Sequence, residues 1–249
     1  MTPNPTILLI PGSFAPPTIY HPLITALRTA SHPALVLTLP STQKRHPLPP
    51  ATMHDDASLI RAVTEALIAQ GKQVVVVCHS YGGVPTSEAL VGLGVGKEGG
   101  GGVRRIVYFT AVVPRVGERQ VDAVGMAGGM VEGAVDGYMH TAPHLLAQAI
   151  GNDLPTWEEA YELASLLPHH SAASFTEAVT RVAYESIPAS YILCERDFII
   201  SPELQEGFIG VLREGGREVG VVRLDAGHCA NWSRVGEVVG GILGEAGRV

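Results

Sequence analysis

The fold of this chain is decided by residues 73–84, which read Q-V-V-V-V-C-H-S-Y-G-G-V. The apolar run 74–78 leads to Ser80, and the paired glycines Gly82 and Gly83 follow before a segment of helical character. This order predicts a buried strand that turns abruptly into a helix, with the serine at the apex. Such a turn strains the serine backbone and needs small neighbours, because a Cβ would collide across it. The stretch therefore marks Ser80 as a candidate nucleophile.

Further apolar runs predict five more strands, and most of them show no polar alternation. Strands that are apolar throughout are covered on both faces, which is typical of a parallel sheet between helices. We therefore predict an α/β fold with a mostly parallel, six-stranded sheet flanked by helices. The predicted strands lie at 6–10, 34–39, 74–78, 103–110, 191–194 and 219–224.

The stretch 114–186 interrupts this pattern, because it contains no convincing strand. Helical stretches are predicted there instead, at 142–150, 156–167 and 174–183. Ligands of open parallel sheets bind at the carboxyl ends of the strands. We therefore expect a single domain over 1–249, with a core of 1–113 and 187–249 and a helical cap of 114–186 above that end of the sheet.

Two polar groups follow the fifth and sixth predicted strands. Asp197 stands just after the fifth strand and His228 just after the sixth. Because the carboxyl ends of parallel strands share one edge of a sheet, both are expected near Ser80. A serine hydroxyl becomes an effective nucleophile when a base removes its proton and a third group orients that base. Glu195, which is nearer the strand end, is the alternative acid.

Together these segments resemble α/β-hydrolases of the compact branch that includes plant methylesterases, hydroxynitrile lyases and small fungal and bacterial serine esterases. The resemblance covers essentially the whole chain. It implies that Ser80 is the nucleophile of a nucleophile elbow, with Asp197 as acid and His228 as base. It also implies an oxyanion hole made by the backbone amides of Ser13 and Tyr81. The resembling motifs are L-L-I-P-G-S at 8–13, D-D-A at 55–57, C-H-S-Y-G-G at 78–83, Y-I-L-C-E-R-D at 191–197 and D-A-G-H at 225–228.

The chain departs from the family pattern at two positions. Pro11 replaces the histidine that usually precedes Gly12, which puts the bracing of the oxyanion loop in question. Cys78 replaces the first glycine of the elbow, and we expect the turn to tolerate this small residue.

The resemblance implies a serine esterase or lactonase that cleaves a carboxylic ester through an acyl-enzyme. A hydroxynitrile lyase is less favoured, because that branch typically has threonine in place of Gly12 and lysine in place of Cys229. The same fold also hosts ligand receptors and biosynthetic cyclases that keep the triad, and the sequence leaves this alternative open.

The expected substrate is a small ester or lactone with an apolar or aromatic, uncharged acyl portion, because the loop after the first strand and the predicted cap carry few charges. Aromatic and polar side chains in these segments are candidate substrate contacts. They are Phe14, Tyr20, Tyr138, His140 and Trp157.

The composition argues against two classes of binding partner. The net charge is −7 and no block of basic residues occurs, so neither nucleic acid nor a membrane surface is an expected partner. Three cysteines cannot all pair, and we expect buried thiols in a cytoplasmic monomer or homodimer. No metal, nucleotide or flavin is implied. Because neighbours on a helix point apart, His169 and His170 are expected at a solvated helix end rather than in a metal site.

Overall fold

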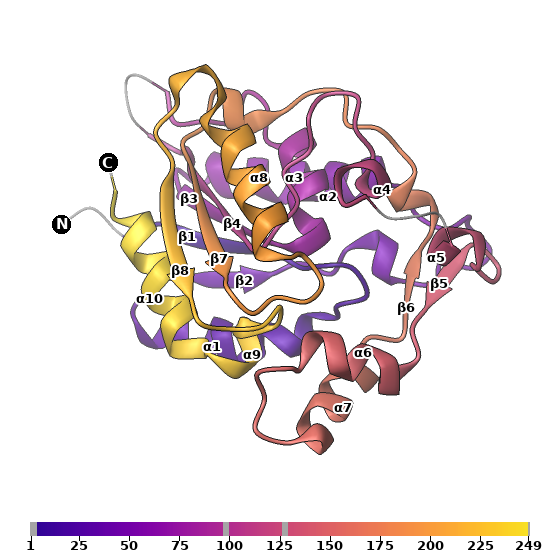
Figure 1. Ribbon diagram of the computed structural model, residues 1–249. Coiled ribbons are helices and arrows are strands. Elements are labelled where there is room, and N and C mark those ends of the chain that lie inside the picture. Colours follow the sequence, from indigo (N-terminus) through magenta and orange to yellow (C-terminus); the bar gives the residue numbers. More distant parts are fainter. Residues whose placement is uncertain (1–3, 97–99, 126–128, 249) are drawn as a thin grey trace.

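A parallel sheet forms the centre of the protein (Figure 1). The computed structural model describes residues 4–96, 100–125 and 129–248. All neighbouring strands of this sheet run parallel, in the order β2-β1-β3-β4-β7-β8, which confirms the predicted α/β fold. The strands are β1 (Thr6–Ile10), β2 (Ala34–Val36), β3 (Gln73–His79), β4 (Gly102–Phe109), β7 (Ala189–Cys194) and β8 (Gly220–Leu224).

Strand β3 lies inside the sheet, between β1 and β4. Its residue Val77 is opposite Leu9 of β1 and Val107 of β4, and every side chain from Val74 to His79 is buried. Branched valine side chains suit such a strand, because they pack well on both pleated faces. Each buried valine stabilises the fold by about 1.5 kcal/mol or more, so the strand that carries the serine is held firmly in place.

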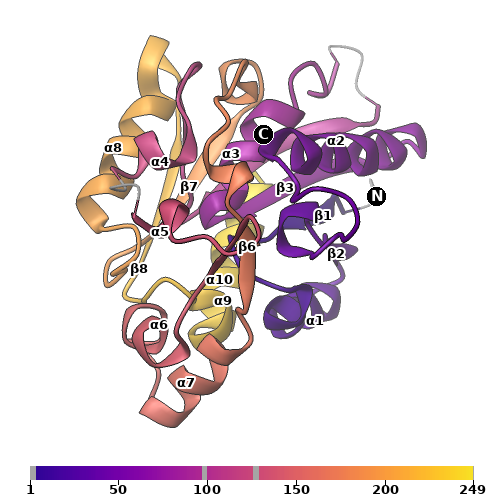
Figure 2. The same ribbon diagram turned by 90° about the vertical axis from the view of Figure 1, so that its right-hand side faces the viewer.

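Helices cover both faces of the sheet (Figures 1 and 2). Helices α1 and α10 pack against each other on one face, whereas α2, α3 and α8 lie on the other. None of the helices in the described ranges is long and apolar enough to cross a membrane. The bounds are α1 (His21–Thr29), α2 (Met53–Ala69), α3 (Gly83–Ala89), α8 (Pro202–Arg213), α9 (Ala230–Ser233) and α10 (Val235–Ala246).

The segment 114–186 follows β4 and precedes β7, and we call it the inserted segment. It lies at the side of the molecule opposite the chain termini (Figure 1). The prediction that it contains no strand is wrong, because β5 (Tyr138–His140) and β6 (His169–Ser171) form an antiparallel pair. Three-residue strands are too short to produce a visible period of two. Its helices are α4 (Gln120–Ala123), α5 (Gly129–Glu132), α6 (Pro143–Ile150) and α7 (Trp157–Ser165).

The helix predicted at 174–183 is also wrong. Only short 3₁₀ turns occur at Ala173–Phe175 and Ala183–Glu185. Between them the backbone is bonded to other segments: the Val179 amide donates to the Glu118 carbonyl at 2.9 Å, and the Thr180 amide donates to the Glu88 carboxylate at 2.7 Å. These long-range partners replace the hydrogen bonds that a local helix would make.

Candidate functional site

Ser80 occupies a strained turn directly after β3. Its φ is +53°, in the left-handed region that side chains rarely adopt. A Cβ on Gly82 would lie 2.5 Å from the Pro11 carbonyl oxygen, and one on Gly83 would lie 2.1 Å from the Val112 carbonyl oxygen. Only glycine fits at these two positions, so the paired glycines allow β1 and the segment after β4 to approach the serine closely.

The turn accommodates cysteine in place of its first glycine because the Cys78 side chain points into the core. The thiol is fully buried and donates to the Val107 carbonyl at 3.7 Å. Burial raises the pKa of this thiol well above its ordinary value, so Cys78 is not an alternative nucleophile.

The structure brings the predicted acid and base together. Asp197 and His228 are both buried, and His228 Nδ1 lies 2.6 Å from Asp197 Oδ2. Asp197 Oδ1 accepts hydrogen bonds from the amides of Ile199 at 2.7 Å and Ile200 at 3.0 Å, and Thr110 Oγ1 donates to Oδ2. Burial opposes ionisation of Asp197, but His228 and these donors outweigh it and hold the pKa of the carboxyl below its ordinary value.

Glu195, the alternative acid, does not reach the histidine. Its carboxylate is half exposed and lies 3.8 Å from Arg223. The two acidic residues that follow β7 therefore have different surroundings. The Asp197 side chain turns inward to His228, whereas the Glu195 side chain faces solvent. The structure places Asp197, and not Glu195, beside the candidate base.

Ser80 and His228 border one cavity of about 260 Å³. Both side chains are almost buried, with 6% and 5% of their surface exposed. No hydrogen bond between the two is present among the described residues. Such bonds are often long without substrate and tighten when substrate binds. The absence of this bond therefore does not exclude His228 as the base for Ser80.

The loop after β1 leaves one amide free at this cavity. The Gly12 amide donates to the Tyr20 hydroxyl at 3.0 Å, and the Phe14 amide donates to His170 Nδ1 at 3.2 Å. The Ser13 amide between them has no acceptor within the described ranges. Ser13 also borders the cavity, so its amide remains the candidate donor that the oxyanion-hole prediction names.

A chain of hydrogen bonds braces this loop against the turn and the base. The Tyr20 hydroxyl, which accepts from Gly12, lies 2.7 Å from His79 Nδ1, and His79 Nε2 lies 3.0 Å from the His228 carbonyl oxygen. These partners assign the proton of neutral His79 to Nε2. Burial lowers the pKa of His79 to about 3, so the ring stays neutral. The brace does not require a histidine at the position of Pro11.

Tyr81, which directly follows the nucleophile, is anchored through its side chain. Its hydroxyl donates to Asp56 Oδ2 at 2.7 Å, and Asp56 Oδ1 accepts from the Ser41 amide at 2.9 Å. The Tyr81 ring stacks on Phe175 with centroids 5.4 Å apart. Burial raises the pKa of Asp56 to about 6. The Tyr81 side chain is thus held in the core by a buried carboxylate 25 residues earlier in the chain, a contact that no local sequence pattern indicates.

His170 corrects the prediction of a solvated helix end at 169–170. The residue lies on β6 and is fully buried. Its Nδ1 accepts from the Phe14 amide, and its Nε2 lies 3.0 Å from Ser174 Oγ, which in turn donates to the Ser171 carbonyl. The inserted segment therefore holds the loop after β1 through one imidazole. No local pattern in the sequence indicates this contact, because its two partners are 156 residues apart.

Folding stability should depend on pH through His170. Burial lowers its pKa from 6.5 to about 3, so between these values the unfolded chain binds a proton that the folded chain does not. The free energy of unfolding therefore falls as pH falls, by at most about 1.4 kcal/mol per pH unit for this group. In urea unfolding between about pH 6 and 4, His170→Gln should show a shallower fall than wild type. The exposed His140→Gln serves as control; an equal slope in His170→Gln would contradict the prediction.

Most of the predicted substrate contacts do not line the cavity. Phe14 borders the cavity, but Tyr20, Tyr138, His140 and Trp157 do not. The Tyr20 hydroxyl is used in the brace, and the Tyr138 hydroxyl donates to the Gln43 carbonyl. His140 is exposed, and Trp157 is 53% exposed on the outer face of α7. The apolar lining residues are Phe14, Ala15, Ile19, Val124, Leu146, Ile150, Leu167, Phe175, Phe198, Ile199 and Ile200.

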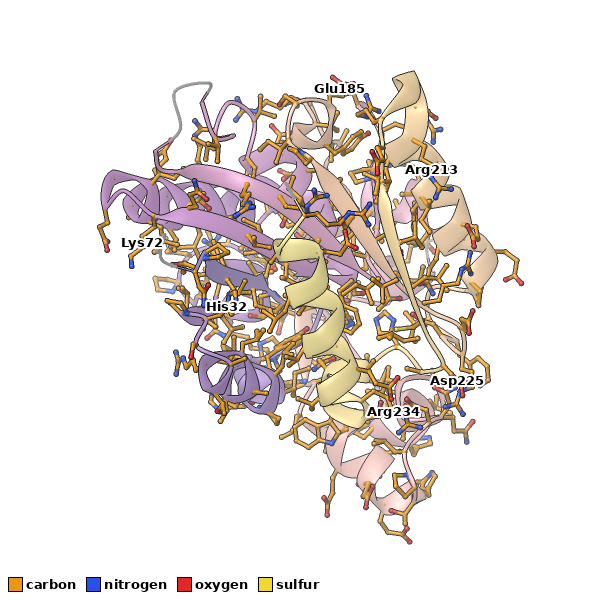
Figure 3. The ribbon with its side chains drawn as sticks, turned by 90° about the vertical axis from the view of Figure 1, so that its left-hand side faces the viewer. His32, Lys72, Glu185, Arg213, Asp225 and Arg234 are labelled. Carbon is orange, nitrogen blue, oxygen red and sulfur yellow. The ribbon has the colours of Figure 1, made fainter. Side chains whose placement is uncertain are left out.

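Two larger hollows, of about 840 and 570 Å³, lie at the other edge of the sheet. They are bordered by the amino ends of the strands, on the side shown in Figure 3, where Lys72 and Glu185 are labelled. Neither contains Ser80, Asp197 or His228. Because parallel sheets bind ligands at the carboxyl ends of their strands, the smaller cavity is the candidate site.

Comparison with known proteins places the chain in a family. A model of the "Alpha/beta hydrolase family" matches residues 7–240. "Probable hydrolase R7" from Phoma sp. is 52% identical over 246 residues, covering 97% of this chain and 99% of that protein. "Alpha/beta hydrolase nvfD" from Aspergillus novofumigatus is 27% identical, covering 98% and 97%. The solved structure of polyneuridine aldehyde esterase has a TM-score of 0.76 at 20% identity, covering 98% and 99%. Because the family model spans nearly the whole chain and a relative over half identical covers it almost completely, the protein belongs to the alpha/beta hydrolase family.

Proposed function

We propose that the protein hydrolyses carboxylic esters or lactones, with Ser80 as nucleophile, His228 as base and Asp197 as the acid that orients it. The observation that carries the proposal is the His228–Asp197 pair at 2.6 Å, whose histidine borders the same cavity as the strained Ser80. The hydrolase names of the relatives at 52% and 27% identity support this class of reaction.

The mechanism follows from the placement of these groups. His228 Nε2 takes the proton of Ser80 Oγ as that oxygen attacks the carbonyl carbon, and Asp197 stabilises the imidazolium. The amides of Ser13 and Tyr81 donate to the oxyanion, which then collapses to the acyl-enzyme. The alkoxide leaves with the proton from His228. A water molecule, deprotonated by His228, attacks the acyl carbon next, and Ser80 is released with its proton restored.

The shape of the site supports a small, largely apolar substrate. A cavity of about 260 Å³ with a mostly apolar wall disfavours a charged acyl group, which would lose its hydration without gaining an ion pair. We propose that residues 114–186 act as the cap of the site, because Val124, Leu146, Ile150 and Leu167 border the cavity. The three cysteines are buried and unpaired, which suits the proposed cytoplasmic location.

A hydroxynitrile lyase is disfavoured by two features of the site. A Cβ at Gly12 would lie 3.0 Å from Ser80 Cβ and 3.2 Å from His79 Nδ1, so a threonine does not fit there without movement of both. Cys229 stands where the lyase lysine would be. It is buried beside the cavity, and because a thiol is never positively charged, it cannot supply the ammonium group that would pair with cyanide.

The proposal is tested with a fluorophosphonate probe and 4-methylumbelliferyl esters on the purified protein. The probe should label Ser80, and the octanoyl ester should be turned over at least about 100-fold faster than the ester of a dicarboxylic acid of equal length. Absence of both labelling and turnover would refute the proposal. Labelling without turnover of any ester would favour a non-hydrolytic lyase or cyclase with an activated serine.

A further inference from the structure

Gln120, in the cavity wall, carries a buried polar atom that has no partner among the described residues. Gln120 is the first residue of α4, is 5% exposed and borders the cavity. Its carboxamide oxygen Oε1 is buried without a hydrogen-bond partner among the described residues. Leaving a buried amide oxygen unpaired destabilises a folded protein. A bound ligand that donates a hydrogen bond to this oxygen would remove that cost.

The neighbours of Gln120 in the wall do not provide that partner. Val124, Leu146 and Phe175 are apolar. Thr141, the other polar side chain that the inserted segment contributes to the wall, donates its hydroxyl to the Leu167 carbonyl at 3.0 Å. Among the described wall residues of the inserted segment, Gln120 is therefore the one whose side chain has a buried polar atom left without a partner.

The backbone around Gln120 is held from both sides. The Gly117 amide donates to the Val179 carbonyl at 2.7 Å, and the Val179 amide donates to the Glu118 carbonyl at 2.9 Å. One turn later, the Asp122 carboxylate accepts from the Arg119 amide at 3.2 Å. These bonds fix the start of α4, so the Gln120 side chain joins the cavity wall from a defined backbone.

We propose that Gln120 determines specificity by hydrogen bonding to an uncharged hydroxyl group of an otherwise apolar ester or lactone. A carboxamide offers a donor and an acceptor at the same end, and a hydroxyl both donates and accepts, so it satisfies either orientation of the amide. A charged group would be unpaired, because the described residues of the wall include no lysine, arginine, aspartate or glutamate. The assignment of an ester or lactone rests on the proposed function, whereas binding of the hydroxyl does not depend on turnover.

The test measures binding in the Ser80→Ala variant, so that no ligand is consumed. Isothermal titration would compare methyl octanoate with its 3-, 6-, 7- and 8-hydroxy derivatives, and hexyl butanoate with 6-hydroxyhexyl butanoate. At least one hydroxylated ligand should bind about 3- to 10-fold more tightly than its parent. Adding Gln120→Leu should reduce this ratio to about 1. It should also leave Tm unchanged or raised, because the unpaired amide is removed.

The control is Gln148→Leu in the same background, an exposed glutamine on α6, which should keep the wild-type ratio. The proposal is overturned if no hydroxylated ligand is preferred, or if the preference survives Gln120→Leu. Turnover of the same esters by the wild-type protein tests the proposed hydrolysis separately. A hydroxyl preference without turnover would therefore refute the hydrolysis but not the role of Gln120, and turnover without a preference would do the reverse.

Discussion

Replacing Ser80 with alanine is expected to lower kcat for ester hydrolysis by about 10⁶, because the attacking oxygen is lost and water must take its place. His228→Ala should have nearly the same effect. The double variant should be no worse than either single one, because a nucleophile without its base, or a base without its nucleophile, contributes little. The measurement is kcat with the 4-methylumbelliferyl ester that the wild-type protein cleaves best, with Tm as a check of folding.

The matched control for this experiment is Ser87→Ala. Ser87 is fully buried on α3, seven residues after Ser80, and its hydroxyl bonds the Gly83 carbonyl and the Tyr108 hydroxyl at 2.8 Å each. Its loss should cost about 1 kcal/mol of stability and leave kcat within a few-fold of wild type. If Ser80→Ala kept more than about one hundredth of the wild-type kcat, Ser80 would not be the nucleophile.

Asp197→Asn should lower kcat by about 10⁴ while leaving the fold intact. The amides of Ile199 and Ile200 both donate to Oδ1 of the native carboxylate, so an asparagine must keep its oxygen at that position. Its amide nitrogen then faces His228 and donates to Nδ1. That hydrogen bond places the imidazole proton on Nε2, where the ring can no longer accept the proton of Ser80.

Glu195→Gln provides the control for this second prediction, because it makes the same chemical change two residues earlier. Glu195 is half exposed and pairs with Arg223 at the surface, so its loss should change kcat by less than about two-fold and stability by less than about 1 kcal/mol. Equal losses of kcat in Asp197→Asn and Glu195→Gln would contradict the assignment of Asp197 as the acid. A pH profile of kcat for Asp197→Asn would separate a tautomer effect from a loss of structure.

Residue order along the chain was enough to predict the sheet and the residues that meet at its edge. Each predicted strand that ends near Ser80, Asp197 or His228 is present, with ends within two residues of those expected. Such predictions succeed because a parallel sheet collects the carboxyl ends of all its strands at one edge. Local order along the chain then becomes proximity in space.

The inserted segment was predicted less well, for a different physical reason. Its aromatic character makes Trp157 a predicted substrate contact, yet the side chain lies on the outer face of α7 and stacks on Tyr161. The sequence predicts a solvated His170, yet its imidazole accepts a hydrogen bond from the Phe14 amide. Which face of a short helix or strand turns inward depends on how that element packs, and its few residues carry no periodicity that reveals it.

The stretch from 73 to 84 thus dictates a strand, a strained serine and a close-packed helix through local stereochemistry, since valines favour the strand and only glycines fit after the turn. Tertiary packing decides the rest of the site. It pairs Tyr20 with His79 across 59 residues, bonds buried Asp56 to Tyr81, and brings Gln120 to the cavity wall with its carboxamide oxygen unpaired. These contacts join residues distant in sequence, and their energies depend on burial, which arises only when the chain is folded.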